Sequence, residues 1–581
     1  MFFRNQTGVA LLAVIFFLVV MAFVGVIFIS LSSNNMTQSV NEVYSSRALY
    51  IAEGGLERAG RYLLKREGSP PCTTCTCASI NTSTSFNGAV PAFTASGSGQ
   101  FTVTSVFNNN LAPTSLFALT DNVTTTIPAT AANLSVSGYA SFGRIMIDKE
   151  MIDYTALGQG AGVCGGGAPS CFVGAVRGAD GTAPAQHVIG TSVAQTQCLL
   201  TSTGGVPTIG AGTNQRVVSQ ADVVQNGWAV GNTAGGITPP RMFLWDGSSW
   251  ADRTAVAPGG IGNLTSVSML SPADGWAVSG SASGRFIRWN GVNWSSFPLP
   301  AARPLNSIYM NASNDGWAVG NPGGVAAQQP LIYYWDGTTW SLRKTGLPAI
   351  NRNLNSVYCN SNSLPVNCWA VGNAGGVAAQ RPLILYWNGA SWGPRNSLLG
   401  ISSNLNSVYC NSNLVPVTCW AVGNTAGGAP ANERPFILYW NGATWARQNS
   451  LLGIPRNLNS VYCNSNLVPV TCWAVGNPGG GGQRPLILYW NGATWSLRNS
   501  VRNFAGTAVT INLPLRSVSC VTSNDCWAVG SPGGAGQRPL VLHWNGTDWI
   551  IETLNSQNTI LNSVYLIGPK RPNIAWREVP Q

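Results

Sequence analysis

Charged side chains are scarce in this 581-residue chain, where Asp, Glu, Lys and Arg together make up 9% of the residues. Only 20 residues are acidic and only four are lysines, so the formal net charge of +11 comes mainly from arginine. The arginines are scattered, without a run of five or more basic residues. A nucleic-acid patch is therefore not expected, although the net charge can attract anionic cell surfaces weakly.

Histidine is rarer still, with two residues, and the chain has no closely spaced pair of CxxC motifs. Because protein zinc sites are usually built from four Cys and His ligands, zinc is not expected. The Gly-rich loops also lack the two acids that a calcium loop would need. We expect neither a metal nor a cofactor.

The chain is equally poor in residues that could do acid–base chemistry. Glu150, Asp153 and His187 lie in or beside expected turns, and their spacing fixes no common geometry. We interpret them as structural, assign no catalytic residue, and do not expect an enzyme.

Cysteine is abundant, with fourteen residues, and most of them occur as pairs. Four pairs recur at matching places in a repeat, which indicates disulfide bonds formed in an oxidising compartment. The candidate pairs are Cys359 with Cys368, Cys410 with Cys419, Cys463 with Cys472, Cys520 with Cys526, and Cys164 with Cys171 in a Gly-rich loop. Cys72, Cys75 and Cys77 form a further cluster, with Cys198 as a candidate partner, and the sequence leaves their pairing open.

A long apolar stretch, residues 9–31, follows the short polar segment 1–8. About 20 helical residues cross a bilayer core, so this stretch is long enough to span a membrane. Beyond it, apolar residues from Val40 to Leu63 recur at steps of three and four, which is one face of a helix. Gly68, Pro70 and Pro71 end the pattern. We therefore expect one long N-terminal helix over residues 9–67.

The junction at Gly8, the run VALLAVIFFLVVMAFVGV and the later SSRALYIAEGGLERA resemble type IV pilins, and in particular PilX-type minor pilins. The resemblance covers residues 1 to about 67. It implies that residues 1–8 are a leader, that a prepilin peptidase cuts between Gly8 and Val9, and that the helix moves from the inner membrane into a filament. Major pilins usually carry Glu at the fifth mature position, where this chain has Ala13, as some minor pilins do.

Residues 69–205 have the pattern of a small β-rich globular region. Residues 101–106 alternate with the period of a strand, and apolar residues flank an expected turn at Asp148-Lys149-Glu150. The phrase VRGADGTAPAQH resembles a small β module of surface proteins.

Internal repetition dominates residues 206–581. A WAV motif and a following W-[ND]-G-x-x-W motif recur about seven times. The first tryptophans of the repeats are Trp228, Trp276, Trp317, Trp369, Trp420, Trp473 and Trp527. Each unit contains four short strand patterns, and its Asn-Gly predicts a tight hairpin. We expect a β-propeller whose tryptophans fill the seams between blades.

The number of blades stays open at seven or eight. Seven units are complete, and a half-repeat follows at 561–578. That half-repeat could join strands at about 191–203 as an eighth blade or lie over the ring as a hairpin. The expected fold is mainly β: a long N-terminal helix, a small β-rich middle region and this propeller.

The repeats resemble BNR or Asp-box propellers, a family that includes sialidases. The resemblance raises a glycan-processing enzyme as an alternative, which would need an Arg cluster, a Tyr nucleophile and a carboxylate pair. Arg381, Arg434, Arg484 and Arg538 recur once per unit in equivalent places, which favours a structural ring or a binding rim.

The function expected from the sequence is a minor pilin, or tip subunit, that presents the propeller for adhesion. Its expected partners are other pilins, the pilus assembly machinery, the prepilin peptidase, the inner membrane before assembly, and a surface glycan or protein ligand. Its expected location is the inner membrane and then the cell surface. A third alternative is an uncleaved, membrane-anchored assembly scaffold.

Overall fold

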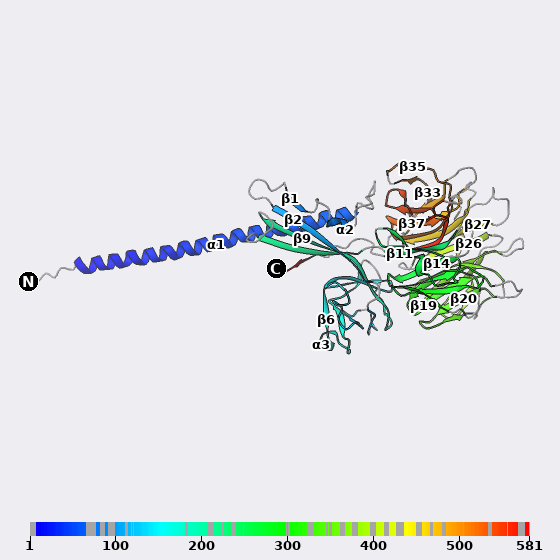
Figure 1. The fold of residues 1–581 in the computed structure, drawn as a ribbon, viewed down its shortest axis with the longest axis horizontal. Coiled ribbons are helices and arrows are strands. Elements are labelled where there is room, and N and C mark those ends of the chain that lie inside the picture. Colours follow the sequence, from blue (N-terminus) through cyan, green and yellow to red (C-terminus); the bar gives the residue numbers. More distant parts are fainter. Residues whose placement is uncertain are drawn as a thin grey trace, which may run out of the picture.

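A computed structural model of the chain is mainly β, with an N-terminal helix, a middle region and a β-propeller (Figure 1). The structure describes residues 7–64, 77–81, 87–90, 99–110, 114–117, 119, 121, 123–179, 184–206, 214–223, 226–233, 240–247, 249–297, 299, 303–322, 329–343, 347, 351–360, 366–374, 382–395, 403–411, 417–425, 435–448, 456–464, 469–478, 484–503, 505–532, 537–554, 556–567 and 576–579.

The N-terminal helix, α1 (Thr7–Leu64), contains 58 residues and covers the range in which one helix is expected. Its second half packs on an antiparallel sheet of the middle region. The strands of that sheet are β1 (Asn87–Val90), β2 (Gly99–Asn110), β9 (Val193–Val206), β10 (Asn214–Val223) and β41 (Trp576–Val579), with β9 between β2 and β10.

Small and apolar side chains on one face of α1 form the contact with this sheet. Ala48, Ala52 and Ala59 are fully buried there, together with Phe101 and Leu200 of the sheet. These alanines belong to the apolar face expected from the sequence.

Glycine in the sheet lets the helix approach closely. A Cβ at Gly204 would overlap the backbone carbonyl oxygen of Ala48, so no larger residue fits at this point of β9. The helix is thereby fixed at its C-terminal half by the sheet.

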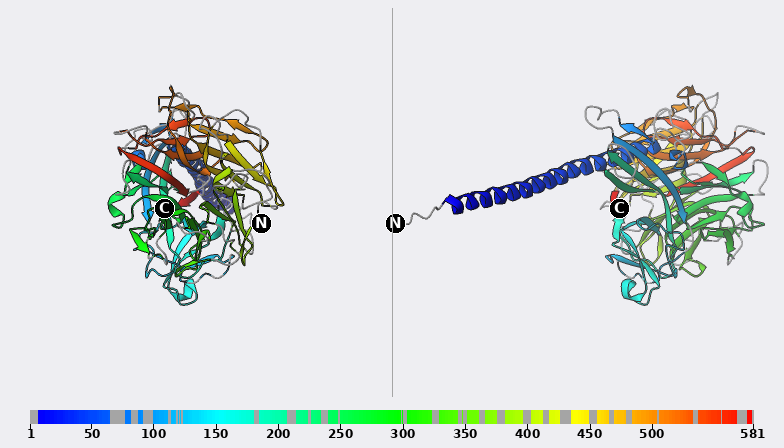
Figure 2. Two further views of the ribbon diagram at one scale, coloured as in Figure 1. Left: turned by 90° about the vertical axis from the view of Figure 1, so that its right-hand side faces the viewer. Right: turned by 60° about the vertical axis from the view of Figure 1, so that its left-hand side comes forward.

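The first half of α1 projects from the body (Figures 1 and 2). From Val14 to Ile29 its large hydrophobic side chains are 40–73% exposed. We call residues 14–29 the apolar rod. Within the described part of the chain, no helix combines the length and the hydropathy required to cross a bilayer.

The remainder of the middle region is connected to the sheet through β9, and it contacts the propeller. A hairpin of β4 (Gly143–Ile147) and β5 (Glu150–Tyr154) pairs with β9 and with β8 (Val176–Ala179). A separate small sheet and two short helices complete it: β3 (Thr126–Ala129), β7 (Ser170–Val173), β6 (Ala156–Gln159), α2 (Cys77–Ile80) and α3 (Ala161–Cys164).

Within the described residues, seven sheets form the blades of the propeller, each with four strands in antiparallel order. Blade 1 contains β11 (Asn226–Thr233), β12 (Pro240–Trp245), β13 (Trp250–Asp252) and β40 (Thr559–Ile567), and a 3₁₀ turn (Thr254–Val256) follows it. Blades 2 to 4 are β14 (Leu264–Ser271) to β17 (Trp294–Phe297), β18 (Leu305–Ala312) to β21 (Trp340–Leu342), and β22 (Leu354–Asn360) to β25 (Trp392–Pro394). Blades 5 and 6 are β26 (Ser403–Cys410) to β29 (Trp445–Arg447) and β30 (Leu458–Asn464) to β33 (Trp495–Leu497).

Between the first and fourth strands given above, blades 2 to 6 each contain a second and a third strand. These are β15 (Asp274–Ser279), β16 (Arg285–Trp289), β19 (Asp315–Gly320), β20 (Leu331–Trp335), β23 (Asn367–Gly372), β24 (Leu383–Trp387), β27 (Cys419–Thr425), β28 (Pro435–Trp440), β31 (Thr471–Gly476) and β32 (Leu486–Trp490). Blade 7 runs from β36 (Leu515–Thr522) through β37 (Asp525–Gly530) and β38 (Val541–Trp544) to β39 (Trp549–Ile551), and β34 (Val501–Arg502) and β35 (Ala508–Val509) extend its outer edge.

The C-terminal half-repeat closes the ring and does not begin an eighth blade. Its first strand, β40, pairs with β11 and becomes the inner strand of blade 1. Its last strand, β41, leaves the propeller and pairs with β10. The strand at 193–206 is β9 of the middle-region sheet, so the suggested eighth blade from about 191–203 is wrong. The range 206–581 thus contributes β10 and β41 to the sheet that holds α1.

Three tryptophans lie at every seam between blades. At one seam the ring of Trp369 is 4.8 Å from that of Trp440 and 5.2 Å from that of Trp445. The closing seam is built in the same way, with Trp527 at 4.5 Å from Trp245 and 5.4 Å from Trp250. The other five seams are built in the same way, with one tryptophan against the two hairpin tryptophans of the next blade. The single tryptophans of these seams are Trp228, Trp276, Trp317, Trp420 and Trp473.

Disulfide bonds join six cysteine pairs among the described residues, which indicates an oxidising or extracellular location. The pairs are Cys77–Cys198, Cys164–Cys171, Cys359–Cys368, Cys410–Cys419, Cys463–Cys472 and Cys520–Cys526. The last four each bridge the first two strands of a blade. Cys72 and Cys75 lie outside the described residues.

Two truncations test the ring closure. Ending the chain at residue 558 removes β40, which exposes the inner edge of β11 and opens the seam at Trp527. We expect this chain to lose cooperative thermal unfolding of the propeller. Ending the chain at residue 567 removes only β41, and the propeller transition should remain. Equal behaviour of the two truncated chains, measured by near-UV circular dichroism in detergent micelles, would contradict closure by β40.

Candidate functional site: the distal mouth of the propeller channel

The propeller has two different ends. The β4–β5 hairpin contacts the end where Met310 and Ser313 lie, which we call the proximal end. The inner strands begin at the opposite end, which we call the distal end. Each inner strand there starts with the pattern L-[NTR]-S-[VI], and the three positions after the leucine build the channel.

A serine belt surrounds the channel. The serine of each inner strand accepts a hydrogen bond from a backbone N–H of the next inner strand, over distances of 3.1–3.3 Å. The belt serines are Ser266, Ser307, Ser356, Ser407, Ser460, Ser517 and Ser563. The last bond, from Val267 N–H to Ser563, joins the second blade to the C-terminal strand. The belt therefore ties all seven inner strands together.

Above the belt lies a polar ring, in which five of the seven positions are asparagine. Asn355 illustrates the asparagine geometry: its Nδ2 donates 2.8 Å to the carbonyl of Leu405 in the next blade. The ring positions are Thr265, Asn306, Asn355, Asn406, Asn459, Arg516 and Asn562. All of them except Arg516 bond the carbonyl of the leucine that begins the next inner strand.

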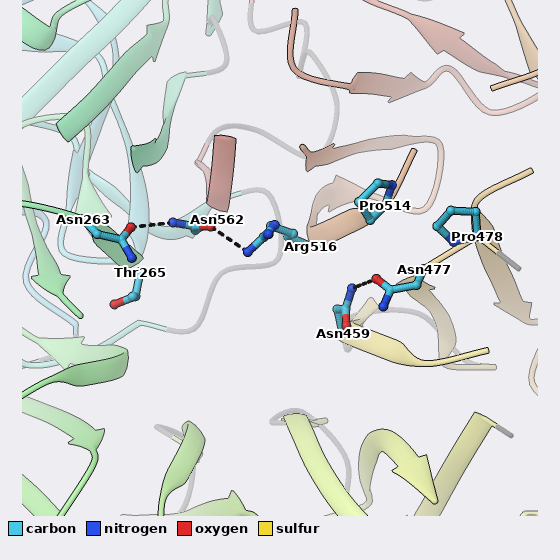
Figure 3. Close-up of a pocket in the computed structure, with 8 residues that line it drawn as sticks. All are labelled: Asn263, Thr265, Asn459, Asn477, Pro478, Pro514, Arg516 and Asn562. Atoms are coloured by element: carbon cyan, nitrogen blue, oxygen red, sulfur yellow. Dashed lines mark hydrogen bonds between the residues drawn. The ribbon is translucent and has the colours of Figure 1, made fainter. Parts of the chain in front are cut away.

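A cavity of about 680 Å³ opens at this ring (Figure 3). Its lining comes from blades 1, 2, 6 and 7: Asn263, Thr265, Asn459, Asn477, Pro478, Pro514, Arg516 and Asn562. Arg516 donates from Nε to Ser531 Oγ at 2.7 Å and from Nη1 to Asn562 Oδ1 at 3.2 Å. The lining contains one cation and no carboxylate, so the mouth can bind polar or anionic groups.

Tyrosine rings fill the channel below the belt. Neighbouring rings from Tyr309 through Tyr358 and Tyr409 to Tyr462 have centroids 4.4–4.6 Å apart. Desolvation raises the pKa of Tyr309 and of Tyr409 well above the usual range for tyrosine. The phenols are therefore neutral.

Lys149 closes the proximal end. It lies at the tip of the β4–β5 hairpin, with Nζ 4.1 Å from the centroid of the Tyr309 ring and bonded to the carbonyl of Met310. Burial of the amine lowers the pKa of Lys149 to about 7, while the charges of Asp148 and Asp315 act in the opposite direction. The β4–β5 hairpin therefore places a buried amine against the proximal end of the inner strands.

The three acid–base residues noted in the sequence do not share one site. Glu150 and His187 meet, with Oε2 of Glu150 at 2.8 Å from Nε2 of His187, while Asp148 lies at 2.8 Å from Nδ1. Asp153 instead forms an ion pair with Arg144. Two carboxylates on one imidazole favour its doubly protonated form.

This cluster is structural. Burial would raise the pKa of Glu150, but hydrogen bonds from His187 and Arg177 lower it to about 2. Burial would likewise lower the pKa of His187, but hydrogen bonds to Asp148 and Glu150 raise it. These side chains are buried away from the cavity, where their ionic bonds fix the hairpin that carries Lys149.

Of the recurring arginines, Arg484 and Arg538 are described, and they lie at the distal end just before the third strands of blades 6 and 7. Arg538 is exposed, and neither of these two arginines belongs to the lining of the cavity. Arg381 and Arg434 lie outside the described residues. Gly8 and Val9 lie within α1, and the surroundings of both residues are outside the described part.

The mouth residues are not among the candidate site residues that the sequence predicts. The signal in the sequence is the register of L-N-S-V-Y, in which Ser recurs in all seven inner strands and Asn and Tyr each recur in five. The departures from that register, Arg516 above all, mark where the ring is asymmetric.

The fold and the site together define a seven-bladed β-propeller with a polar cavity at the distal end of its inner strands. No protein-family model and no curated protein matches the chain. Among solved structures, one titled "YCF48 bound to D1 peptide" is similar with 17% identity, covering 53% of this chain and 91% of that one, at a TM-score of 0.34. "YCF48 from Cyanidioschyzon merolae" has 14% identity, covering 56% and 98%, at a TM-score of 0.35. The fold assignment here depends on the seven sheets themselves.

The substitution Ser407→Ala tests the serine belt. It leaves the N–H of Val461 without its acceptor at a buried seam and should lower the free energy of unfolding by about 1–3 kcal/mol. Ser295→Ala is the matched control, because Ser295 is exposed and should change stability little. Equal effects of the two substitutions in chemical denaturation would contradict a role for the belt.

The substitution Lys149→Met tests the proximal closure through pH. The folded chain holds Lys149 with a lowered pKa, so the unfolded chain binds more protons above about pH 7, and stability should rise with pH between about pH 7 and pH 9. Lys149→Met should flatten this rise. An unchanged slope, measured by denaturation at several pH values, would show that the amine is not desolvated at Tyr309.

Proposed function

We propose that the protein is a type IV pilin-like minor subunit that carries its propeller at the end of a filament as a binding domain. The observation that carries the proposal is the apolar rod, which is exposed on all sides and continuous with the sequence that resembles pilins. An exposed apolar surface of this length is unfavourable in water, so it needs a cover. The apolar helices of neighbouring filament subunits supply one.

A position at the tip fits the size and arrangement of the domains. The propeller and the rod lie at opposite ends of the molecule (Figure 1). A head of this size on every subunit would crowd a helical shaft, while one copy at the end would not. Ala13, in the place where major pilins usually carry Glu, agrees with a minor subunit.

Before assembly, the same helix would be held in the inner membrane. This part of the proposal depends on the sequence of residues 9–31, because the side chains of residues 7–13 lie outside the described part. The prepilin peptidase would then release the helix by cutting between Gly8 and Val9. The disulfides agree with a propeller exposed outside the cytoplasm.

Mass spectrometry of the mature N-terminus tests the processing. We expect a chain that begins at Val9 when the prepilin peptidase is present, and an intact chain in its absence. Gly8→Val should block the cut and keep the protein in the membrane fraction, while Gly25→Val, inside the rod, should leave the cut unchanged. A wild-type chain that still begins with Met1 would support the uncleaved scaffold and contradict the proposal.

Immunogold labelling with antibodies against the propeller tests the location. The expected result is label at filament ends, and loss of that label in Gly8→Val cells. Label confined to the inner membrane in wild-type cells, together with unchanged adhesion after deletion, would contradict the proposal.

A further inference from the structure

The charges of the propeller are separated between its two ends. Six of its acidic residues lie in turns at the proximal end: Asp246, Asp274, Asp315, Asp336, Asp525 and Asp548. Several of them are neutralised or hydrogen-bonded locally, as in the Asp274–Arg288 pair at 3.1 Å and the Asp525–His543 pair at 2.9 Å. Because most acidic residues of the propeller lie at the proximal end, the distal end carries few negative charges.

Arginine dominates the distal end. Among the described residues, the connections at this end carry two acids, Asp252 and Glu552, and a larger number of arginines. These arginines are Arg253, Arg303, Arg352, Arg456, Arg484, Arg498 and Arg538. The distal end is therefore a basic face, formed from residues far apart in the chain.

Two other arginines follow the fourth strands of blades 3 and 4, but their guanidiniums stack on rings nearer the proximal end. The guanidinium of Arg343 lies 4.6 Å from the centroid of Tyr334, and that of Arg395 lies 5.0 Å from the centroid of Tyr386. Each tyrosine directly precedes the hairpin tryptophan of its blade, so these two cations are not counted in the basic face.

Arg516 places a cation inside the mouth. Asparagine fills this position in five of the other six blades and bonds a leucine carbonyl of the next blade, a bond that Arg516 does not make. Its guanidinium has five N–H donors, of which Ser531 and Asn562 take two, and both acceptors are neutral. No carboxylate pairs with it among the described residues. The free donors suit a carboxylate bound in two-pronged geometry.

The size and charge of the cavity limit what can bind. A cavity of about 680 Å³ with one cation suits one end group or side group of a longer ligand, and the rest of that ligand would continue across the basic face. Neutral amide and hydroxyl groups of Asn459, Asn477 and Thr265 surround Arg516, and they match sugar hydroxyls. Tyr334 and Tyr386 are covered by arginine, so they offer no open rings on which nucleic acid bases could stack.

We propose that the distal face binds a carboxylated polysaccharide, with one sugar carboxylate in the cavity at Arg516 and further carboxylates on the surrounding arginines. This inference builds on the proposed function, because it names the ligand class of the domain that the filament would display.

Isothermal titration calorimetry on the full-length protein in detergent micelles tests the inference. The probes are polygalacturonate, its fully methyl-esterified form, and a single-stranded oligonucleotide. We expect polygalacturonate to bind, more weakly as salt is raised, and the esterified polymer to bind at least about tenfold more weakly, because it has no carboxylates.

The substitution Arg516→Asn tests the contribution of the cavity to binding separately from that of the other arginines. This variant installs the residue that other blades use, so the ring should fold, and thermal unfolding checks this. We expect it to bind polygalacturonate about tenfold more weakly, the loss of one charged hydrogen-bonding partner. Arg58→Gln, which removes an exposed cation on α1, should leave binding unchanged.

Three results would overturn the inference: equal binding of the esterified polymer, unchanged binding by folded Arg516→Asn, or binding of the oligonucleotide alone. The outcome is independent of the filament proposal. A mature chain that begins at Val9 and lies at filament ends, but does not bind polygalacturonate, would contradict only this inference. Binding by a chain that stays uncleaved would contradict only the filament proposal.

Discussion

The bonds between neighbouring inner strands are the interaction on which the propeller depends. Each four-stranded sheet is too small to bury both of its faces alone, so its stability comes from the next blade. The serine belt and the three tryptophans at each seam provide that contact, the first by hydrogen bonding near the axis and the second by packing further out. Because every blade needs both neighbours, the ring has to close, and β40 closes it with a strand more than 300 residues from its partner β11.

Closure of the ring also determines which end of the propeller the middle region occupies. The chain leaves the ring after β40 and returns through β41 to the sheet that holds α1. The middle region is thereby fixed to the proximal end, where Lys149 covers the channel and Thr191 contacts Ser313. The rod then lies on the same side of the propeller as the middle region (Figure 1), whereas the cavity lies at the distal end of the inner strands. Binding at the mouth and burial of the rod can therefore occur at the same time.

The positions of the disulfides fit this arrangement. Blades 4 to 7 each carry a disulfide between their first two strands, at the proximal end. Blades 2 and 3 have short turns there without cysteine. The middle region contacts blade 3 through Lys149 at Met310 and Thr191 at Ser313, and Met146 packs on the core cluster that includes blade 2. A bridge restricts the unfolded chain by about 2–3 kcal/mol for a loop this short. In blades 2 and 3, contacts with the middle region stabilise the proximal turns, as the disulfides do in blades 4 to 7.

The sequence by itself determined what repeats locally. The Trp, Asn-Gly and Cys patterns are periodic, so they predict four-stranded units and the disulfide pairs, because each depends on neighbours within one repeat. Only the tertiary structure decided how many blades close, since the pairing of β40 with β11 links the two ends of the repeat array. The contact of Lys149 with the proximal end and the cavity at Arg516 are likewise decided by the tertiary structure. Each brings together side chains from segments that no periodicity relates, and their burial and charge exist only once the ring has formed.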